Sequence, residues 1–230
     1  MKYLIILFLL FFTVGNAQVV DRVNRFTQSI GGGVPTYVTS GTPTALLSNS
    51  LDVDLPDIIN PNDILIGHVM VSSQVVTIST PTGWTAIENS DASNYTGGLF
   101  WKRADGAEVG TVTFTHTGTA TTTFHAQIHR FSGCANTGTP YEAYTLVSMD
   151  FEQLINFPAM TSTGNDRLAI ALIQNGDDRS INPDATNYTN IVSSKTTVGT
   201  DSWLLLYTYS QATSGNTPTD TVTWDKNERV

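Results

Sequence analysis

The chain has 230 residues and a formal charge of −9 at neutral pH, and only 13% of its side chains are charged. Nucleic acid and anionic membrane surfaces would repel such a chain, so neither is expected as a partner. The length suffices for one large β-sandwich or two small ones. A single cysteine, Cys134, excludes an intrachain disulfide, so stability must come from the core.

The first 17 residues have the pattern of a secretory signal peptide. Lys2 precedes an apolar run over residues 3–14, and the small residues Gly15 and Ala17 precede Gln18. The run is shorter than the roughly 20 apolar residues of a membrane-spanning helix, and the small-residue site argues against the alternative of an uncleaved anchor. We therefore expect a secreted or cell-surface chain that begins at Gln18 and has no membrane span after cleavage.

Residues 18–33 predict a flexible leader because they end in three glycines, and residues 34–230 predict the folded body. No window of the body sustains helical spacing of apolar residues, whereas short β runs alternate with turn residues. The run at residues 64–71 is apolar on both faces and predicts a central strand. Strands are expected in the first half at residues 36–40, 45–47, 64–71, 75–79, 84–88, 95–103, 111–116 and 121–131.

Part of this pattern returns about a hundred residues later. Asn62 before ILIGHVMV matches Asn165 before RLAIALIQ at an offset of 103, and later matches follow in the same order at offsets of 102 and 104, then 108, then 110. Each half could form its own sandwich, or both could form one body around a pseudo-twofold axis. We favour the second, because no linker separates Gly133 from Glu142 and nothing after Trp224 matches the strand at 121–131. Either the halves cover each other or the chain is a shortened form.

The expected architecture is therefore all-β. It is an antiparallel, jelly-roll-like β-sandwich of one domain, residues 34–230, built from two pseudo-repeated halves at about 34–133 and 134–230.

Several strand and turn motifs occur in a set order, namely Asn-Asp-Ile-Leu-Ile from Asn62, Thr-Pro-Thr-Gly-Trp-Thr from Thr80, Leu-Phe-Trp-Lys-Arg-Ala from Leu99, Gly-Thr-Val-Thr-Phe from Gly110 and Ile-His-Arg-Phe-Ser-Gly from Ile128. This order resembles a β-sandwich module that recurs in bacterial exported surface proteins and in phage tail-associated or fibre proteins. The resemblance implies a non-catalytic module for display, adhesion or virion structure, and it transfers no active site. The signal peptide favours the surface or secreted product.

No motif predicts a metal centre, a cofactor or nucleophilic catalysis. His125 and His129 have the spacing that binds zinc on a helix, but on a strand they would lie about 13 Å apart. His68 is expected to be a hydrogen-bonded core residue. Cys134 follows Ser132-Gly133 in a turn without a Gly-x-Ser-x-Gly elbow, and we interpret it as a small buried residue.

Carboxylates are the remaining candidates for glycan hydrolysis, which uses two of them across a groove. The candidate groups are Asp52 with Asp54, Asp91, Asp177 with Asp178, and Glu142 with Glu152. Acidic residues in exported turns are usually solvated, and none of these has EF-hand spacing. Asp177 and Asp178 are the best calcium candidates.

Aromatic residues offer a binding site instead, because sugar rings stack on exposed aromatic faces. Trp84 and Trp101 alternate with apolar neighbours and are expected in the core, whereas Tyr95 and Tyr188 adjoin Asn-rich tips and are expected at the surface. The predicted ligand-binding residues are Tyr95, Asp91, Tyr188, Asp177 and Asp178.

The resulting hypothesis is a non-enzymatic exported module for adhesion or for binding a glycan or other cell-surface polymer. The alternatives are a structural component of a phage virion or cell-surface fibre, with other subunits as partners, and a glycan-active hydrolase.

Overall fold

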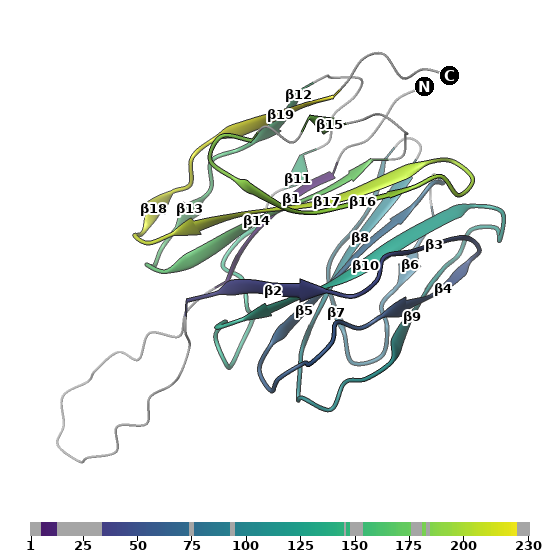
Figure 1. Cartoon of the computed structure of the whole chain (residues 1–230), viewed down its shortest axis with the longest axis horizontal. Coiled ribbons are helices and arrows are strands. Elements are labelled where there is room, and N and C mark those ends of the chain that lie inside the picture. Colours follow the sequence, from purple (N-terminus) through teal and green to yellow (C-terminus); the bar gives the residue numbers. More distant parts are fainter. Residues whose placement is uncertain are drawn as a thin grey trace.

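The computed structural model describes residues 6–12, 34–73, 76–92, 95–144, 146–147, 154–175, 181–182 and 185–224. Within these ranges every regular element is a β-strand, and all strand pairs are antiparallel (Figure 1). The expected all-β antiparallel sandwich is thus confirmed. No helix in this part of the chain has the length and apolar character that crossing a bilayer requires.

Two large sheets form the middle of the molecule. The first large sheet contains, in spatial order, β2 (Thr36–Ser40), β10 (Thr123–Ser132), β5 (Ile64–Val71), β8 (Tyr95–Arg103) and β7 (Thr85–Ala92), and β3 (Thr44–Leu47) also pairs with β10. The second large sheet contains, in spatial order, β11 (Leu146–Val147), β1 (Ile6–Phe12), β14 (Arg167–Asn175), β17 (Ser202–Gln211) and β16 (Thr189–Thr196).

Two small sheets cover the outer faces of the large ones (Figure 1). The first small sheet has the order β4 (Ser50–Asp54), β9 (Thr111–His116) and β6 (Ile78–Ser79). The second small sheet has the order β12 (Leu154–Phe157), β19 (Asp220–Trp224) and β15 (Ile181–Asn182). A two-stranded ribbon joins β13 (Thr161–Ser162) to β18 (Gly215–Asn216). The molecule is therefore a stack of four antiparallel layers.

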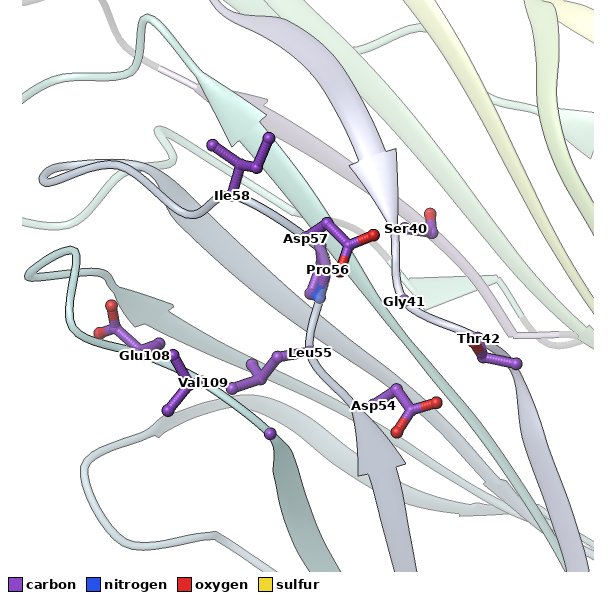
Figure 2. Close-up of a pocket in the computed structure, with 11 residues that line it drawn as sticks. Ser40, Gly41, Thr42, Asp54, Leu55, Pro56, Asp57, Ile58, Glu108 and Val109 are labelled. Atoms are coloured by element: carbon purple, nitrogen blue, oxygen red, sulfur yellow. The ribbon is translucent and has the colours of Figure 1, made fainter.

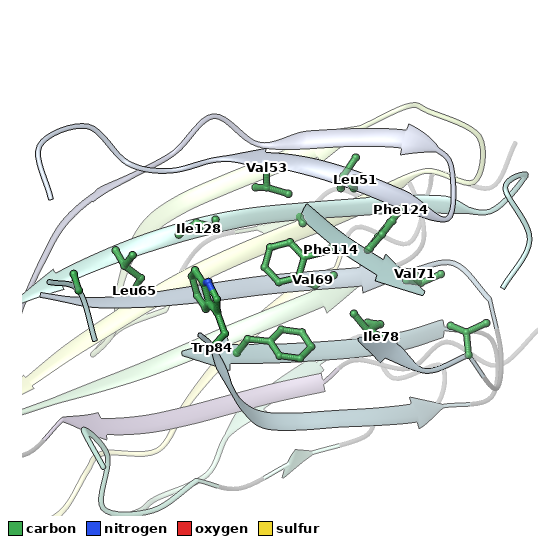
Figure 3. Packing of buried hydrophobic residues seen from close by; sticks show 14 of the residues in the cluster. Leu51, Val53, Leu65, Val69, Val71, Ile78, Trp84, Phe114, Phe124 and Ile128 are labelled. Atoms are coloured by element: carbon green, nitrogen blue, oxygen red, sulfur yellow. The ribbon is translucent and has the colours of Figure 1, made fainter. Parts of the chain in front are cut away.

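Three large hydrophobic cores and one small cluster hold the described layers together. The first outer core lies between the first small and first large sheets, and Figure 3 shows Phe114 and Trp84 packed over β5 within it. The central core lies between the two large sheets, and the second outer core lies under the second small sheet. β5 alternates as predicted, because Ile64 and Ile66 enter the central core while Leu65 enters the first outer core.

The central strands of the two large sheets pair with their neighbours at corresponding positions. Ile64 of β5 pairs with Arg103 of β8, and Leu168 of β14 pairs with Ser210 of β17. Ile64 and Leu168 both face the central core and lie 104 positions apart. β7 and β16 each carry an irregularity, between Ala86 and Glu88 and between Asn190 and Val192, which is again 104 positions apart.

This register differs by one residue from the offset of 103 expected for β5. An offset of 103 would match Leu65, which lies in the first outer core, with Leu168, which lies in the central core. Because neighbouring strand residues point to opposite faces, a one-residue slip exchanges the two cores. The sequence repeat of the two halves stays a prediction. The strand pairing in the two large sheets favours an offset of 104 residues over 103 for it.

Most expected strands of the first half are present, with three differences. Of the strand expected at 75–79, the described part is strand only at Ile78–Ser79, which form β6. The polar residues between the strands expected at 84–88 and 95–103 are in part strand, because β7 continues to Ala92 and pairs with β8 up to Tyr95. β4 was not expected, although its burial alternates strictly and buries only Leu51 and Val53. A five-residue strand with three polar positions has too little apolar content to be recognised without its partner β9.

Part of the apolar run of the predicted signal peptide lies in the second large sheet. Residues Ile6–Phe12 form β1 between β14 and β11. Cleavage after Ala17 stays a prediction, and so do the boundaries of the leader and the domain.

Candidate functional site

Both tyrosines expected at the surface are buried, so that expectation is wrong. Tyr95 is 7% exposed and packs with Met70 and Leu204. Tyr188 is 3% exposed, and its ring centroid lies 5.0 Å from that of Phe157. Each tyrosine adjoins a polar tip in the sequence, but each ring turns inward, where it adds to a core. Neither ring can stack on a sugar from these positions.

The acidic members of the predicted site are only partly described. Asp91 lies in β7 opposite Thr96 of β8, and the conformation of its side chain is outside the described residues. Asp177 and Asp178 lie outside them altogether. The described part of the chain contains no cluster of three or more histidine, cysteine or acidic side chains suited to a metal ion. Ligand and calcium binding at these aspartates stay predictions.

Three histidines are buried between the large sheets. His125 contacts the hydroxyls of Ser202 at 2.9 Å and Ser194 at 3.0 Å, and His129 contacts that of Ser40 at 2.7 Å. Burial lowers the pKa of His125 to about 4 and that of His129 to about 3. His68 is fully buried and its pKa is also well below the usual value, because of burial and then of His129 and His125. These are neutral residues of the interior.

His68 has no hydrogen-bond partner on either ring nitrogen among the described residues, so the expected hydrogen bond is not there. Cys134 is buried as predicted, and burial raises the pKa of its thiol, which makes it unreactive. Glu142 binds Arg167, with 2.7 Å between Oε1 and Nη2, which places it in an ion pair. Trp84 is in the first outer core and Trp101 packs against the central core, as expected.

Two adjoining hollows lie where loops meet at one end of the first outer core. The first hollow, of about 370 Å³, is bounded by the chain after β2, the segment after β4 and the turn between β8 and β9. The second hollow, of about 470 Å³, is lined in part by the turn before β7 and by Trp84. Both include Leu55, Glu108 and Val109, so they are two sides of one ridge. Volumes of this size are typical of ligand pockets.

A buried ion pair holds the segment after β4. Arg130 Nε lies 2.6 Å from Asp63 Oδ2, and both side chains are at least 93% buried. The same carboxylate oxygen accepts a hydrogen bond from the backbone N–H of Asn60 at 2.8 Å. Arg130 also reaches the carbonyl of Asp57 at 3.5 Å. The segment from Leu55 to Asn60 is thus fixed from its far side, which leaves its outer side for a ligand.

A network around Glu108 holds the facing turn. Its carboxylate accepts hydrogen bonds from the backbone N–H groups of Asp105 and Gly106, each at 3.0 Å, and lies 3.1 Å from Lys102 Nζ. Burial alone would raise the pKa of Glu108, but these hydrogen bonds hold it below its usual value. Gly110 accepts a backbone hydrogen bond from Leu55 and so ties the two loops together.

Exposed apolar side chains border this site. Val109 is 85% exposed and Ile58 is 80% exposed, and both line the first hollow. Ile58 also has a φ of 53°, a left-handed conformation that β-branched residues rarely adopt and that costs about 1–3 kcal/mol. Strain of this kind persists where the surrounding structure fixes it, and it is concentrated at functional sites.

The first hollow combines these apolar groups with carboxylates. Asp54 and Asp57 are exposed and line it, together with Ser40 and Thr42 (Figure 2). Its lining contains no histidine, cysteine or lysine, and its Ser40 hydroxyl contacts Nδ1 of the buried His129 at 2.7 Å. Carboxylates and hydroxyls beside an apolar rim can accept hydrogen bonds from a ligand and contact its apolar face. The arrangement suits binding.

The sequence interpretation missed this site, although it considered Asp54 as a carboxylate. The stretch Leu55-Pro56-Asp57-Ile58-Ile59-Asn60-Pro61 joins turn-forming residues to two isoleucines. Apolar β-branched residues between two prolines are unusual in a solvent-exposed loop, and this signal could have pointed to it. Comparison of the chain with protein-family models, with curated proteins and with solved structures gives no match.

Proposed function

We propose that this chain is an exported, non-catalytic surface module that binds a glycan or a related hydroxylated polymer at the paired hollows. The observation that supports this best is the placement of exposed Ile58 and Val109 beside the carboxylates of Asp54 and Asp57. A sugar presents apolar C–H faces and polar hydroxyl edges, and this lining offers a partner for each.

The position in the fold also favours binding. The hollows lie on loops at the end of a packed sandwich, where a rigid scaffold can present recognition residues. Two hollows that share the ridge of Leu55 and Val109 offer neighbouring subsites to consecutive units of a polymer. Asp54 and Asp57 replace Tyr95 and Tyr188 as the residues we assign to the ligand.

The test is a titration of the purified protein with a panel of soluble polysaccharides, followed by tryptophan fluorescence. Trp84 lines the second hollow, and a Trp84→Phe variant identifies its share of the signal. We expect saturable binding that Asp54→Asn with Asp57→Asn weakens roughly 10- to 100-fold, the size expected for lost hydrogen bonds to charged groups.

Asp52→Asn is the matched control. Asp52 is exposed on β4 like Asp54, but it accepts a hydrogen bond from Thr113 and lines neither hollow. Equal weakening by the control, or no binding to any polysaccharide, would contradict the proposal. Release of reducing sugar in the same wells would instead support the hydrolase alternative.

A structural role in a virion or cell-surface fibre is the second candidate, and one observation favours it. Val38 of β2 and Leu46 and Leu47 of β3 are 41–51% exposed along one edge of the first large sheet. Exposed apolar side chains on adjacent strands suit contact with another subunit. Light scattering should show an oligomer that Leu46→Glu dissociates if this edge is used, and a monomer in both cases if it is not.

A further inference from the structure

β1 occupies in the second large sheet the position that β10 occupies in the first. In the first sheet Ile64 of β5 lies between Arg103 of β8 and Phe131 of β10. In the second sheet Leu168 of β14 lies between Ser210 of β17 and Phe12 of β1. Since Ile64 and Leu168 face the same central core, Phe12 occupies in β1 the position that Phe131 occupies in β10.

The correspondence continues along both strands. His125 of β10 pairs with Met70, and Ile6 of β1 pairs with Gln174, which lies 104 positions after Met70. Both strands run antiparallel to their central neighbour, and both pair on their far side, β10 with β2 and β3, and β1 with β11. The second sheet therefore has a defined place for one more strand, including its direction and its register.

The residues that fill this place belong to the predicted signal peptide. Removal of residues 1–17 would take β1 away and leave β14 paired only with β17 among the described strands. β14 lies between two cores, because Ala169 and Ala171 belong to the second outer core and Ile170 and Leu172 to the central core. Unpaired backbone groups on such a strand are costly, and an open edge invites another strand.

We propose that in the exported protein this place accepts a β-strand from a partner chain of the same surface assembly. The inference rests on the export and cleavage in the proposed function. The donated segment is extended, about seven residues long like β1, and antiparallel to β14. Main-chain hydrogen bonds to β14 supply affinity, and side chains that reach both cores supply specificity.

The occupant must be apolar on both faces. All seven residues of β1 are apolar, and β14 contributes only apolar side chains from Leu168 to Ile173. The first polar residue of β14 along this strand position is Gln174, which pairs with Ile6. Gln174 is 2% exposed and donates a hydrogen bond to the carbonyl of Val69 at 2.8 Å.

The test starts from the full chain, with a specific protease site placed at the glycines of residues 31–33. The folded protein is cut there, and a labelled peptide of residues 5–13 with terminal lysines is added. We expect the peptide to replace the cut strand, and washing the strand out should lower the Tm by about 5 °C or more, which the peptide restores. A Leu9→Pro peptide lacks one ladder N–H and should bind at least 10-fold more weakly.

Register is tested by disulfide trapping. A Phe11→Cys peptide should crosslink to Ala169→Cys, which is its Cα partner, and not to Ile173→Cys, which lies four residues along β14. Cys134 does not interfere, because it is buried and its thiol pKa is raised.

Three outcomes overturn the inference. The first is a cut protein that keeps its Tm without β1 and rejects the peptide. The second is crosslinking without preference between the two cysteines. The third is an intact mass showing that the exported protein retains residue 1. Polysaccharide titration of the same samples separates this inference from the proposed binding function, because the hollows and the β1 position share no residue.

Discussion

The two halves of the molecule solve the same packing problem with different resources. In the first half, β10 extends the sheet beyond β5 with a strand from the same region of the chain. In the second half, the corresponding place beside β14 is filled from the opposite end of the chain, by β1. The comparison teaches that a layered sandwich requires its strand positions to be filled, and that any segment with suitable apolar character can fill them.

Polar groups divide the halves as well. All four histidines of the chain are at positions 68, 116, 125 and 129, within the first half. Its buried ion pair, Arg130 with Asp63, fixes the candidate binding loop, whereas the pair of Arg167 with Glu142 lies in the second half beside Thr163. The first half therefore carries the candidate binding site and the buried histidines, and the second half carries the sheet position that β1 fills.

The largest difference between the halves is expected from their ion pairs. Arg130→Leu leaves the Asp63 carboxylate buried without its cation, which should cost about 3–5 kcal/mol in urea unfolding. Arg167→Leu should cost less, about 1–3 kcal/mol, since Glu142 is more exposed and keeps the two hydrogen bonds from Thr163. The reverse order of the two losses would show that the first-half loop does not depend on Arg130.

Acid should lower the stability of the protein through the buried histidines of the first half. The pKa values of His125 and His129 are lowered to about 4 and about 3, and that of His68 is lowered as well, mainly by burial. The unfolded chain binds protons near pH 6.5 and the folded chain does not, so stability is complete above pH 6.5 and falls as the pH drops below it. At pH 5.5 the loss for the three residues should be about 4 kcal/mol.

This loss is measured by urea unfolding at pH 7 and at pH 5.5. Phe114→Leu serves as the control, because it loosens the first outer core without changing a titrating group and should keep the full pH dependence. Replacement of His129 by Gln should reduce the pH dependence by about a third. Equal stability at both pH values would mean that the three histidines are not buried as neutral groups.

Weakening β1 in the full chain sharpens the comparison at the sheet. Leu9→Pro removes one ladder N–H from β1, and we expect amide exchange at Ala169–Ile173 to accelerate about 100-fold, equivalent to about 3 kcal/mol. Exchange at Leu65–Val69 of β5 should change less, because β10 still covers that strand. Leu9→Val is the control that keeps the N–H. Uniform acceleration in both sheets would show that the two halves open as one unit.

The smallest effect concerns a glycine in β5. A Cβ added at Gly67 would lie 2.8 Å from Phe114 Cζ, which is too close for carbon atoms. Gly67→Ala should therefore cost about 1–3 kcal/mol by overpacking of the first outer core. Gly67→Ala combined with Phe114→Leu should recover part of this loss, since the shorter side chain makes room. Additive losses would mean that Phe114 is not the group that the new methyl meets.

Much of the first half could be predicted from local pattern. Ile64–Val71, Tyr95–Arg103 and Thr111–His116 are strands with the expected bounds, because their residues alternate or are apolar on both faces. The same reasoning failed at Tyr95 and Tyr188, since a polar neighbour in sequence does not decide which way a ring points. Local pattern marks the loop after β4 as unusual but does not give the whole site, because its two sides are brought together from loops about 50 residues apart.

The sequence by itself determined the all-β class, the central position of β5 and the burial of Trp84 and Cys134, since these depend on short-range alternation and residue type. Only the tertiary structure decided which strand lies beside β14, how the four layers stack and where the exposed Ile58 and Val109 meet Asp57. The physical reason is that strand neighbours and loop clusters depend on pairings between distant segments, and the apolar content of a segment does not specify its partner.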